Sequence, residues 1–567
     1  MLTFLSELYG VERAPALEQR LRTTLAAFKQ AHPQLAVAAS PAERLSHDDV
    51  ILITYGDQVH TTGEAPLRTL AHALHQQFGA VVSGVHILPF FPYTSDDGFS
   101  VVDFHTVDPA LGTWEDLAPL RERYRLMYDA VVNHISASSD WFQAFLAGKP
   151  GAERRFIAMD PTTDLSAVTR PRTTPLLTPF ETPHGTRHIW TTFSADQIDI
   201  NYADPDTLLA MIDVLLLYVA QGASLIRLDA IGYLWKEVGT RCIHLPQTHR
   251  VVQLWRSILD EVAPGVLLVT ETNVPHADNI SYFGDGHNEA QMVYQFPLAP
   301  LTLNAFHSGS TRHLNSWAAT LAPPSPATTF FNFLASHDGI GVVPASGILS
   351  QAEVADLCET TIRHGGQVSY KNNSDGSQSP YELNITLFDA LSDPAQNDPL
   401  AIDRFIGAHA IMLMLQGVPG IYIHSLIGSH NNHAGLAETG RARTINREKW
   451  EYGELARRMA DPQRHERRVF ERMAALIRAR RAEPAFHPNA AQRVIRAGDA
   501  IFCLLRTRGN RHVLAIQNVS ATPQRFEIAA TDRPIGALID LISGTQFDAT
   551  ISEFSLAPYQ TLWLASA

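Results

Sequence analysis

The sequence predicts an α/β protein, a (β/α)8 TIM barrel with two long inserted loop domains and a C-terminal antiparallel β-domain. Short apolar runs alternate with helical patterns, eight such runs occur, and polar residues gather where several of them end. Strands that alternate with helices indicate βα units and a parallel sheet, and eight of them fit a closed barrel. The candidate strands are residues 49–55, 84–90, 126–134, 225–234, 265–272, 292–296, 329–335 and 418–423.

The run at residues 225–234 shows how one strand is recognised. It follows an apolar helical pattern that ends at Gly222, a helix stop signal. Its first residues are almost all apolar, as in a buried strand. Arg227 and Asp229 interrupt it, and residues two apart on a strand point to the same face. Two buried charges must be paired to be tolerated, so they form either a structural ion pair or part of a site.

Two connections are too long to be ordinary loops. Residues 135–204 follow the third strand and residues 339–399 follow the seventh, so we expect each to be an inserted domain of a barrel that spans residues 47–483. After the barrel, residues 484–567 turn to short alternating segments, which predict the antiparallel β-domain.

Residues 1–46 precede the first strand and carry a helical pattern. Leu17, Leu21, Leu25 and Phe28 recur at three- and four-residue spacing. The pattern predicts a helical arm. It could serve as a dimer contact, which would make the protein a homodimer, or as support for a lid, and the sequence does not decide between them.

Composition excludes several classes of protein. A net charge of −14 argues against a nucleic-acid partner, which would need a basic face. The three cysteines, Cys242, Cys358 and Cys503, are isolated, which argues against a disulfide framework and a zinc site. The N-terminus lacks the pattern of a signal peptide, and the longest apolar run, residues 411–423, is too short to span a bilayer. We therefore expect a cytoplasmic protein without a membrane partner.

Ionisable residues collect at the strand ends, where barrels of this kind carry their catalytic groups. Packing alone is a poor explanation for three carboxylates, two histidines and an arginine at one rim. They are Arg227, Asp229, Glu271, His134, His337 and Asp338.

Two chemistries fit this rim. A metal-dependent hydrolase could use His134, His337 and carboxylates as ligands, although the usual His-x-His cluster is missing. Glycosyl transfer needs two carboxylates, one as nucleophile and one as acid/base, and a third can stabilise the transition state. A catalytically dead scaffold protein would be expected to have lost one of the three carboxylates.

Four segments resemble the signature regions of the α-amylase superfamily, glycoside hydrolase family 13. They are Asp129-Ala-Val-Val-Asn-His134, Arg227-Leu-Asp-Ala-Ile-Gly-Tyr233, Glu271-Thr-Asn273 and Phe333-Leu-Ala-Ser-His-Asp338. Within the superfamily the chain looks most like the sucrose phosphorylase group, through segments such as His86-Ile-Leu-Pro-Phe-Phe91 and Thr444-Ile-Asn-Arg447.

The resemblance implies a double displacement without metal or organic cofactor, with inorganic phosphate as co-substrate. Asp229 would be the nucleophile and Arg227 would hold it ionised, since an adjacent cation lowers a carboxylate's pKa. Glu271 would be the acid/base and Asp338 the transition-state stabiliser. The residues that would bind the glucose ring are Asp97, Phe99, His134, His337 and Arg443.

The same resemblance implies which residues meet phosphate and the acceptor. Tyr233 and Arg172 match positions that accompany phosphate. Ser379 stands where sucrose phosphorylases carry an aspartate that binds fructose, and Glu382 stands where they carry a glutamine. In these departures and in the N-terminal arm, the chain resembles the glucosylglycerate phosphorylases of this group.

A glycerate leaving group carries a carboxylate, so a cation beside the acceptor is expected. The candidates are Lys371, Arg172 and His364. The reaction implied is reversible phosphorolysis of 2-O-α-D-glucosyl-D-glycerate. The alternatives are a sucrose, sucrose 6'-phosphate or glucosylglycerol phosphorylase, and after these a hydrolase or transglucosidase of the family.

Overall fold

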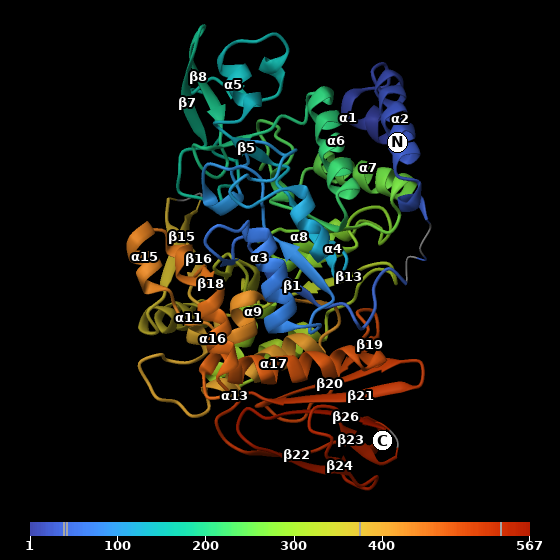
Figure 1. The fold of residues 1–567 in the computed structure, drawn as a ribbon, viewed down its shortest axis with the longest axis vertical. Coiled ribbons are helices and arrows are strands. Elements are labelled where there is room, and N and C mark those ends of the chain that lie inside the picture. The colour runs from blue at the N-terminus through green and yellow to red at the C-terminus, as the bar shows by residue number, and fades with distance from the viewer. Residues whose placement is uncertain (38–39, 41–42, 374–375, 533, 535, 567) are drawn as a thin grey trace.

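The computed structural model describes residues 1–37, 40, 43–373, 376–532, 534 and 536–566. Residues 38–39 and 41–42 of the predicted arm, and 374–375 of the second insertion, lie outside the described residues. The centre of the molecule is a closed barrel of eight parallel strands (Figure 1). The strands are β1 (Ile51–Thr54), β3 (Gly84–Ile87), β4 (Arg125–Ala130), β10 (Ala223–Leu228), β11 (Leu267–Thr270), β12 (Met292–Tyr294), β13 (Thr329–Asn332) and β17 (Val418–Tyr422).

Each of the eight predicted runs overlaps a barrel strand, so the predicted fold class is confirmed. The runs extend past the strands at their C-terminal ends, where the chain bends into loops that carry the polar residues. Helices separate most strands along the chain, as the alternation predicted. They include α3 (Pro66–Ala73), α6 (Pro205–Ala220), α7 (Pro246–Val262), α9 (Leu298–Ser308), α13 (Ala401–Met414) and α17 (His465–Arg481).

The first insertion forms small antiparallel sheets and one short helix. In one sheet β5 (His134–Ser136) pairs with β9 (Gln197–Asp199), which places His134 opposite Asp199. The other sheet holds β6 (Ala158–Met159), β7 (Leu177–Thr182) and β8 (Gly185–Trp190), next to α5 (Asp140–Leu146). The insertion ends where Asp204 caps α6 by accepting a hydrogen bond from the backbone N–H of Thr207.

The second insertion holds two α-helices and a three-stranded sheet. The strands are β14 (Ile340–Gly341), β15 (Gln367–Asn372) and β16 (Gln378–Asn384). The helix α11 (Gln351–Arg363) lies between β14 and β15 in the chain, and α12 (Leu387–Leu391) follows β16. The pairing of β15 with β16 shifts register between Ser369, opposite Glu382, and Tyr370, opposite Pro380. Tyr381 is therefore the extra residue of a β-bulge.

The arm consists of α1 (Leu2–Tyr9) and α2 (Ala14–Ala31), which pack on α6 and α7 of the barrel (Figure 1). α2 buries Leu17, Leu21 and Leu25, as their spacing predicted. An ion pair of 2.8 Å between Lys29 Nζ and Glu261 Oε1 joins α2 to α7. The arm thus extends the hydrophobic core of the barrel; a dimer contact through its outer face stays a prediction.

The C-terminal β-domain begins after a short 3-10 turn at Pro484–Phe486. Its main sheet has the order β19, β20, β21, β26, β23, β24 and is antiparallel, as predicted. The strands are β19 (Ala491–Val494), β20 (Ile501–Arg508), β21 (Arg511–Asn518), β23 (Leu538–Asp540), β24 (Gln546–Phe547) and β26 (Thr561–Ser566), with β22 (Gln524–Glu527) and β25 (Glu553–Leu556) as a separate pair.

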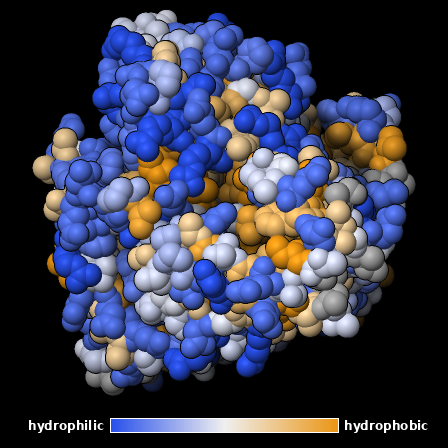
Figure 2. All heavy atoms as spheres, turned by 90° about the horizontal axis from the view of Figure 1, so that it is seen from below, coloured by the Kyte–Doolittle hydropathy of each residue, from blue (hydrophilic) through white to orange (hydrophobic). Residues whose placement is uncertain are grey.

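The surface is mostly hydrophilic on the side seen in Figure 2, and its apolar side chains gather in patches. No helix in the described part of the chain is both long and apolar enough to cross a membrane.

Candidate active site

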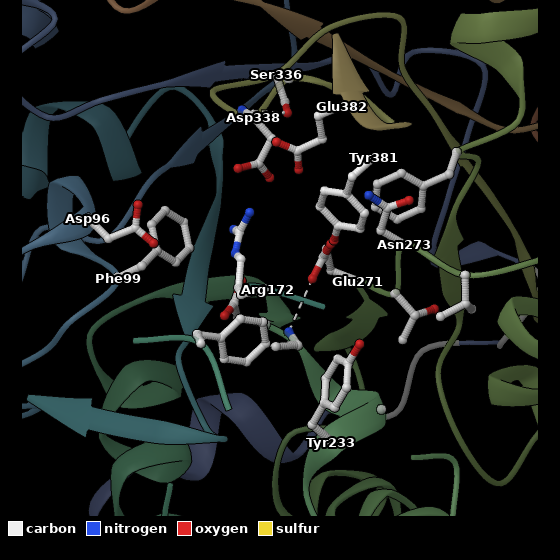
Figure 3. Close-up of a pocket in the computed structure, with 18 of the residues that line it drawn as sticks. Asp96, Phe99, Arg172, Tyr233, Glu271, Asn273, Ser336, Asp338, Tyr381 and Glu382 are labelled. Carbon is white, nitrogen blue, oxygen red and sulfur yellow. Dashed lines mark hydrogen bonds between the residues drawn. The ribbon is translucent and has the colours of Figure 1, made fainter. Parts of the chain in front are cut away.

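A cavity opens at the C-terminal ends of the barrel strands, lined by loops after the strands and by both insertions (Figure 3). It brings together all three carboxylates that the sequence singled out. The lining residues used below are Asp96, Phe99, His134, Arg172, Phe193, Gln197, Asp229, Tyr233, His244, Glu271, Asn273, His337, Asp338, Tyr381, Glu382 and Arg443.

Arg227 is a buried charge next to the residues that line the cavity. It is 1% exposed, and its Nη1 donates to Oδ1 of Asp229 at 2.8 Å and to Oδ1 of Asp129. Its Nη2 lies 3.8 Å from Oε2 of Glu271. His86 Nε2 lies 2.6 Å from the other oxygen of Asp129. One buried guanidinium is therefore shared by three carboxyl groups. Buried ion pairs need additional hydrogen bonds of this kind to offset the free-energy cost of removing the charges from water.

The backbone after β10 holds Glu271 in place. Ala230 adopts a left-handed conformation, with φ 49°, and its N–H donates to Oε2 of Glu271 at 3.1 Å. A non-glycine residue in this region carries strain of about 1 kcal/mol or more, and such strain collects at functional sites. The turn places the Asp229 and Glu271 carboxyls on the same guanidinium.

Protonation differs among the three carboxyls. Burial, helped by the charges of Asp229 and Asp338, raises the pKa of Glu271 to about 7 against the effect of Arg227. Burial also raises the pKa of Asp229, and Arg227 only partly offsets it. Arg227 lowers the pKa of Asp229, as expected, but burial has the larger effect, so the net pKa is raised. Although burial opposes it, Arg443 holds the pKa of Asp338 well below its usual range.

Arg443 links Asp338 to the second insertion. Its Nη1 lies 2.6 Å from Oδ1 of Asp338, and its Nη2 donates to Glu382 at 2.7 and 3.0 Å. Glu382 is 3% exposed. The sequence had assigned Glu382 to phosphate or acceptor, whereas the structure pairs it with Arg443.

Aromatic rings and histidines form one wall of the cavity. Phe99 stacks on His337, with ring centroids 4.8 Å apart and an angle of 5° between planes. Burial lowers the pKa of His337 well below its usual value, so this imidazole is neutral. His134 Nε2 lies 2.8 Å from the carbonyl of Phe99 and 3.2 Å from the amide of Gln197. These contacts fix two imidazoles and a flat apolar ring, the groups that a sugar ring needs.

Asp97 lies outside the lining of the cavity, and this corrects the sequence-based prediction. It pairs with Arg447, while its neighbour Asp96 lines the cavity and accepts a hydrogen bond from Gln197 at 3.4 Å. Both aspartates have left-handed backbones, with φ 53° at Asp96 and 49° at Asp97. Asp96 thus faces the cavity, whereas Asp97 faces Arg447.

The opposite wall carries Arg172, Tyr233, Asn273 and Tyr381 (Figure 3). The Arg172 guanidinium lies 5.6 Å from the centre of the Tyr381 ring, in a cation–π contact. Burial raises the pKa of the Tyr233 hydroxyl, so it stays protonated and can donate a hydrogen bond. This wall offers donors and a cation next to the Glu271 carboxyl.

Three residues predicted at the acceptor lie away from the cavity lining. Lys371 is on β15, and Ser379 on β16 donates to Asn373 Oδ1 at 3.1 Å. His364 is buried at the end of α11, with its Nδ1 2.7 Å from the carbonyl of Asp389. The long insertion thus contributes Tyr381 and Glu382 in place of these residues.

Sequence reasoning missed several residues of the lining. Asn273 stands inside the signature segment of Glu271, and Tyr381 stands beside Glu382, so adjacency to a predicted residue was the available signal for both. Phe193 and His244 come from irregular loop segments, and Gln197 begins the three-residue strand β9, so none of them stands in a periodic pattern.

Comparison with known proteins places this chain in a family. The family model for the alpha-amylase catalytic domain matches residues 76–358. A glucosylglycerate phosphorylase of Allomeiothermus silvanus is 51% identical over 570 residues, which cover 100% of this chain and 98% of that protein. The chain belongs to the α-amylase family, glycoside hydrolase family 13.

Two phosphorylases match at lower identity. A sucrose phosphorylase of Agrobacterium vitis is 32% identical over 467 residues, covering 78% of this chain and 89% of that protein. The crystal structure of a sucrose 6F-phosphate phosphorylase from Thermoanaerobacter thermosaccharolyticum matches with a TM-score of 0.74 at 22% identity, over 90% of this chain and 99% of that chain. The structural match shows a shared fold.

Proposed function

We propose that the protein is a retaining glucoside phosphorylase that converts 2-O-α-D-glucosyl-D-glycerate and phosphate reversibly into α-D-glucose 1-phosphate and D-glycerate. The observation that carries the chemistry is that Asp229 and Glu271 share the Arg227 guanidinium while the Glu271 pKa is raised to about 7. When one of two neighbouring carboxyl groups is ionised and the other keeps its proton, the first can serve as nucleophile and the second as acid/base. The likeness to the glucosylglycerate phosphorylase of A. silvanus supports the acceptor.

In the first half-reaction an oxygen of Asp229 attacks the anomeric carbon of the glucosyl group. The bond from that carbon to the glycerate oxygen breaks, and the proton of Glu271 passes to this oxygen. The products are a β-linked glucosyl ester of Asp229, free glycerate and the Glu271 carboxylate. Esterification removes the charge of Asp229, which lowers the pKa of Glu271 and prepares it to act as a base.

In the second half-reaction a phosphate oxygen attacks the same carbon and the ester bond to Asp229 breaks. Glu271 takes a proton from phosphate. Two inversions leave the product in the α configuration. Asp338, which Arg443 keeps ionised, would bind the sugar hydroxyls and stabilise the positive charge that develops on the ring.

The glucose ring would lie between the histidine wall and the carboxylates. His134 and His337 would donate to or accept from its hydroxyls, Phe99 would meet its apolar face, and Asp96 takes the role first assigned to Asp97. The opposite wall, with Arg172 and Tyr233, would then receive the leaving group and phosphate.

The test is to incubate the enzyme with phosphate and one glucoside at a time, assaying glucose 1-phosphate. We expect release from glucosylglycerate to exceed release from sucrose or glucosylglycerol by at least about tenfold in kcat/KM, the factor that about 1.4 kcal/mol of discrimination provides. Comparable release from sucrose would refute the acceptor assignment. Glucose formed at equal rates with and without phosphate would instead identify a hydrolase or transglucosidase.

We further propose that the reaction needs no metal or organic cofactor, so full activity in chelator is expected. A cytoplasmic location is supported by three cysteines that are all buried and free of disulfides. Substrate, phosphate and a second copy of the chain are the partners that we propose, and the mass in solution tests the homodimer.

A further inference from the structure

Tyr9 connects the N-terminal arm to two segments outside it. It is the last residue of α1, which ends there because Gly10 takes a positive φ of 87°, a value that favours glycine. The Tyr9 hydroxyl donates a hydrogen bond of 2.8 Å to the backbone carbonyl of Tyr202, near the end of the first insertion. The centres of the Tyr9 and Trp235 rings are 6.5 Å apart, and Trp235 stands after β10. The arm lies beside α6 and α7 (Figure 1), and through Tyr9 it also contacts both of these segments.

The Tyr9 hydroxyl is held as a hydrogen-bond donor. Burial, helped by the charge of Asp204, raises the pKa of this phenol, so it keeps its proton near pH 7. Glu7, two residues earlier, forms an ion pair with Arg250 of α7. The helix that carries Tyr9 is thus fastened to the barrel beside it.

The segment of Tyr202 holds the backbone that carries His134. Tyr202 is 1% exposed, and its hydroxyl donates to the carbonyl of Val132 at 2.8 Å. Two residues earlier, the backbone N–H of Ile200 donates to the carbonyl of Asn133 at 2.9 Å. The two carbonyls directly before His134 are therefore both bound by residues 200–202.

The segment of Trp235 reaches the same backbone from another side. Trp235 is buried, and it is followed directly by Lys236. The Lys236 ammonium lies 2.7 Å from Oδ1 of Asn133 and 2.6 Å from Oδ2 of Asp199. One segment thus binds the carbonyl of Asn133 and the other binds its side chain. Tyr9 contacts both segments.

The position of His134 matters for the glucosyl donor. This imidazole lines the cavity, and its charge acts to lower the pKa of Asp229. When a binding loop is ordered in only a fraction of the molecules, the apparent affinity for the ligand falls by that fraction. Contacts that keep the loop of His134 ordered in the free enzyme therefore favour capture of the donor.

We propose that Tyr9 is a positioning residue for the glucose subsite. It holds the two segments that bind Asn133, and through them it keeps the neighbouring His134 in place before the donor arrives. Tyr9 itself touches no substrate. The inference rests on the proposed function and adds a role in the reaction for the arm.

The test uses the two halves of the double displacement. The kcat/KM of a glucosyl donor, glucosylglycerate or glucose 1-phosphate, reports its capture by the free enzyme. The kcat/KM of phosphate or glycerate reports attack on the glucosyl-enzyme, in which the glucosyl group already occupies its subsite. All of these constants are measured for Tyr9→Phe, Tyr9→Ala and Tyr202→Phe. Lys29→Met is the matched control, because it breaks the 2.8 Å ion pair to Glu261 that joins the same arm to α7.

We expect Tyr9→Phe to lower the kcat/KM of both donors by about three- to tenfold, the effect of losing one hydrogen bond. The loss should lie in the KM of the donors, while kcat and the constants of phosphate and glycerate stay at wild-type values. Tyr9→Ala, which also loses the ring against Trp235, should have the larger effect. Tyr202→Phe should reproduce the pattern, and its effect combined with Tyr9→Phe should be smaller than the product of the two. Lys29→Met should leave every constant unchanged.

An equal fall of the donor, phosphate and glycerate constants in Tyr9→Phe would overturn the inference, because it would indicate a general loss of active enzyme. Donor constants at wild-type values in Tyr9→Phe, or an equal effect of Lys29→Met, would overturn it as well. In each case phosphorolysis of glucosylglycerate by the wild type would leave the proposed function standing. A wild type without any phosphate-dependent release of glucose 1-phosphate would refute the function and the inference together. Thermal melting of each variant establishes that folded proteins are compared.

Discussion

Glu382 holds Arg443 through hydrogen bonds of 2.7 and 3.0 Å to one nitrogen, Nη2. The same guanidinium reaches Asp338 through Nη1, at 2.6 Å. A side chain of the second insertion therefore orients the arginine that keeps Asp338 ionised. The insertion is part of the catalytic centre, although Glu382 itself acts through Arg443.

Replacement of Glu382 by glutamine should weaken this positioning. Charge-assisted hydrogen bonds contribute about 1.5–3 kcal/mol, so we expect kcat/KM for phosphorolysis to fall by about ten- to a hundredfold. The loss should lie in kcat, because Asp338 acts on the transition state. Steady-state kinetics measures it, and Glu382→Asp should recover part of the activity. A glutamine variant with wild-type kcat would show that Arg443 needs no such support.

Replacement of Asp229 by asparagine should abolish turnover. The amide cannot form the glucosyl ester, and loss of a nucleophile costs on the order of 10⁴-fold or more. The fold should persist, because the amide oxygen can still accept from Arg227. Asp393→Asn, at a half-buried loop position outside the cavity lining, is the control. Measurable turnover by Asp229→Asn beyond that of contaminating wild type would overturn the assignment of the nucleophile.

The barrel and the three carboxylates could be predicted from the sequence because both follow from local patterns. Each strand is a buried apolar run, Asp229 and Glu271 come directly after one, and Asp338 stands in the loop after β13. For Asp96 and Asp97, local patterns do not predict which side chain lines the cavity. They are chemically identical neighbours, and the local sequence does not decide between them.

Tyr381 and Glu382 show a second case in which the sequence does not predict which side chains face the cavity. Consecutive residues of a regular strand point to opposite faces, yet both line the cavity. The β-bulge at Tyr381 makes this arrangement possible, since an extra residue re-aims its side chain. A bulge depends on pairing between distant segments, and the segment alone does not predict it.

The pH dependence should follow Glu271. Its pKa is raised to about 7, and the first half-reaction needs its protonated form. The rate of glucosyl transfer to the enzyme should therefore fall as pH rises through about 7. A carboxyl with a raised folded-state pKa binds more protons folded than unfolded, so its contribution to stability is also lost as pH rises from about 4.5 to about 7.

A pH profile of kcat/KM for the glucosyl donor checks the kinetic part. Glu271→Gln is the informative variant, tested with α-glucosyl fluoride, whose leaving group needs little protonation. We expect this substrate to be cleaved by the variant without the alkaline decline. A decline that persists in Glu271→Gln would assign it to another group.

Lys236 should be essential for stability although it lies outside the reacting groups. It follows the β10 loop, and its buried ammonium lies 2.6 Å from Asp199 Oδ2 and 2.7 Å from Asn133 Oδ1. Asp199 pairs in register with His134, so one side chain joins the loop after β4, the first insertion and the loop of Tyr233. Lys236→Met would leave the charge of Asp199 buried and unpaired, at a cost of about 3–5 kcal/mol.

The interaction free energy between Lys236 and Asp199 can be measured by urea unfolding of the wild type, the two single variants and the double variant. If the cost of Lys236→Met comes from the stranded charge, then Asp199→Asn in the same chain should restore a large part of the lost free energy. Strict additivity of the two single changes would contradict a direct ion pair. The pair also fixes the strand that carries His134. The double variant should therefore recover more of the wild-type stability than of the wild-type activity.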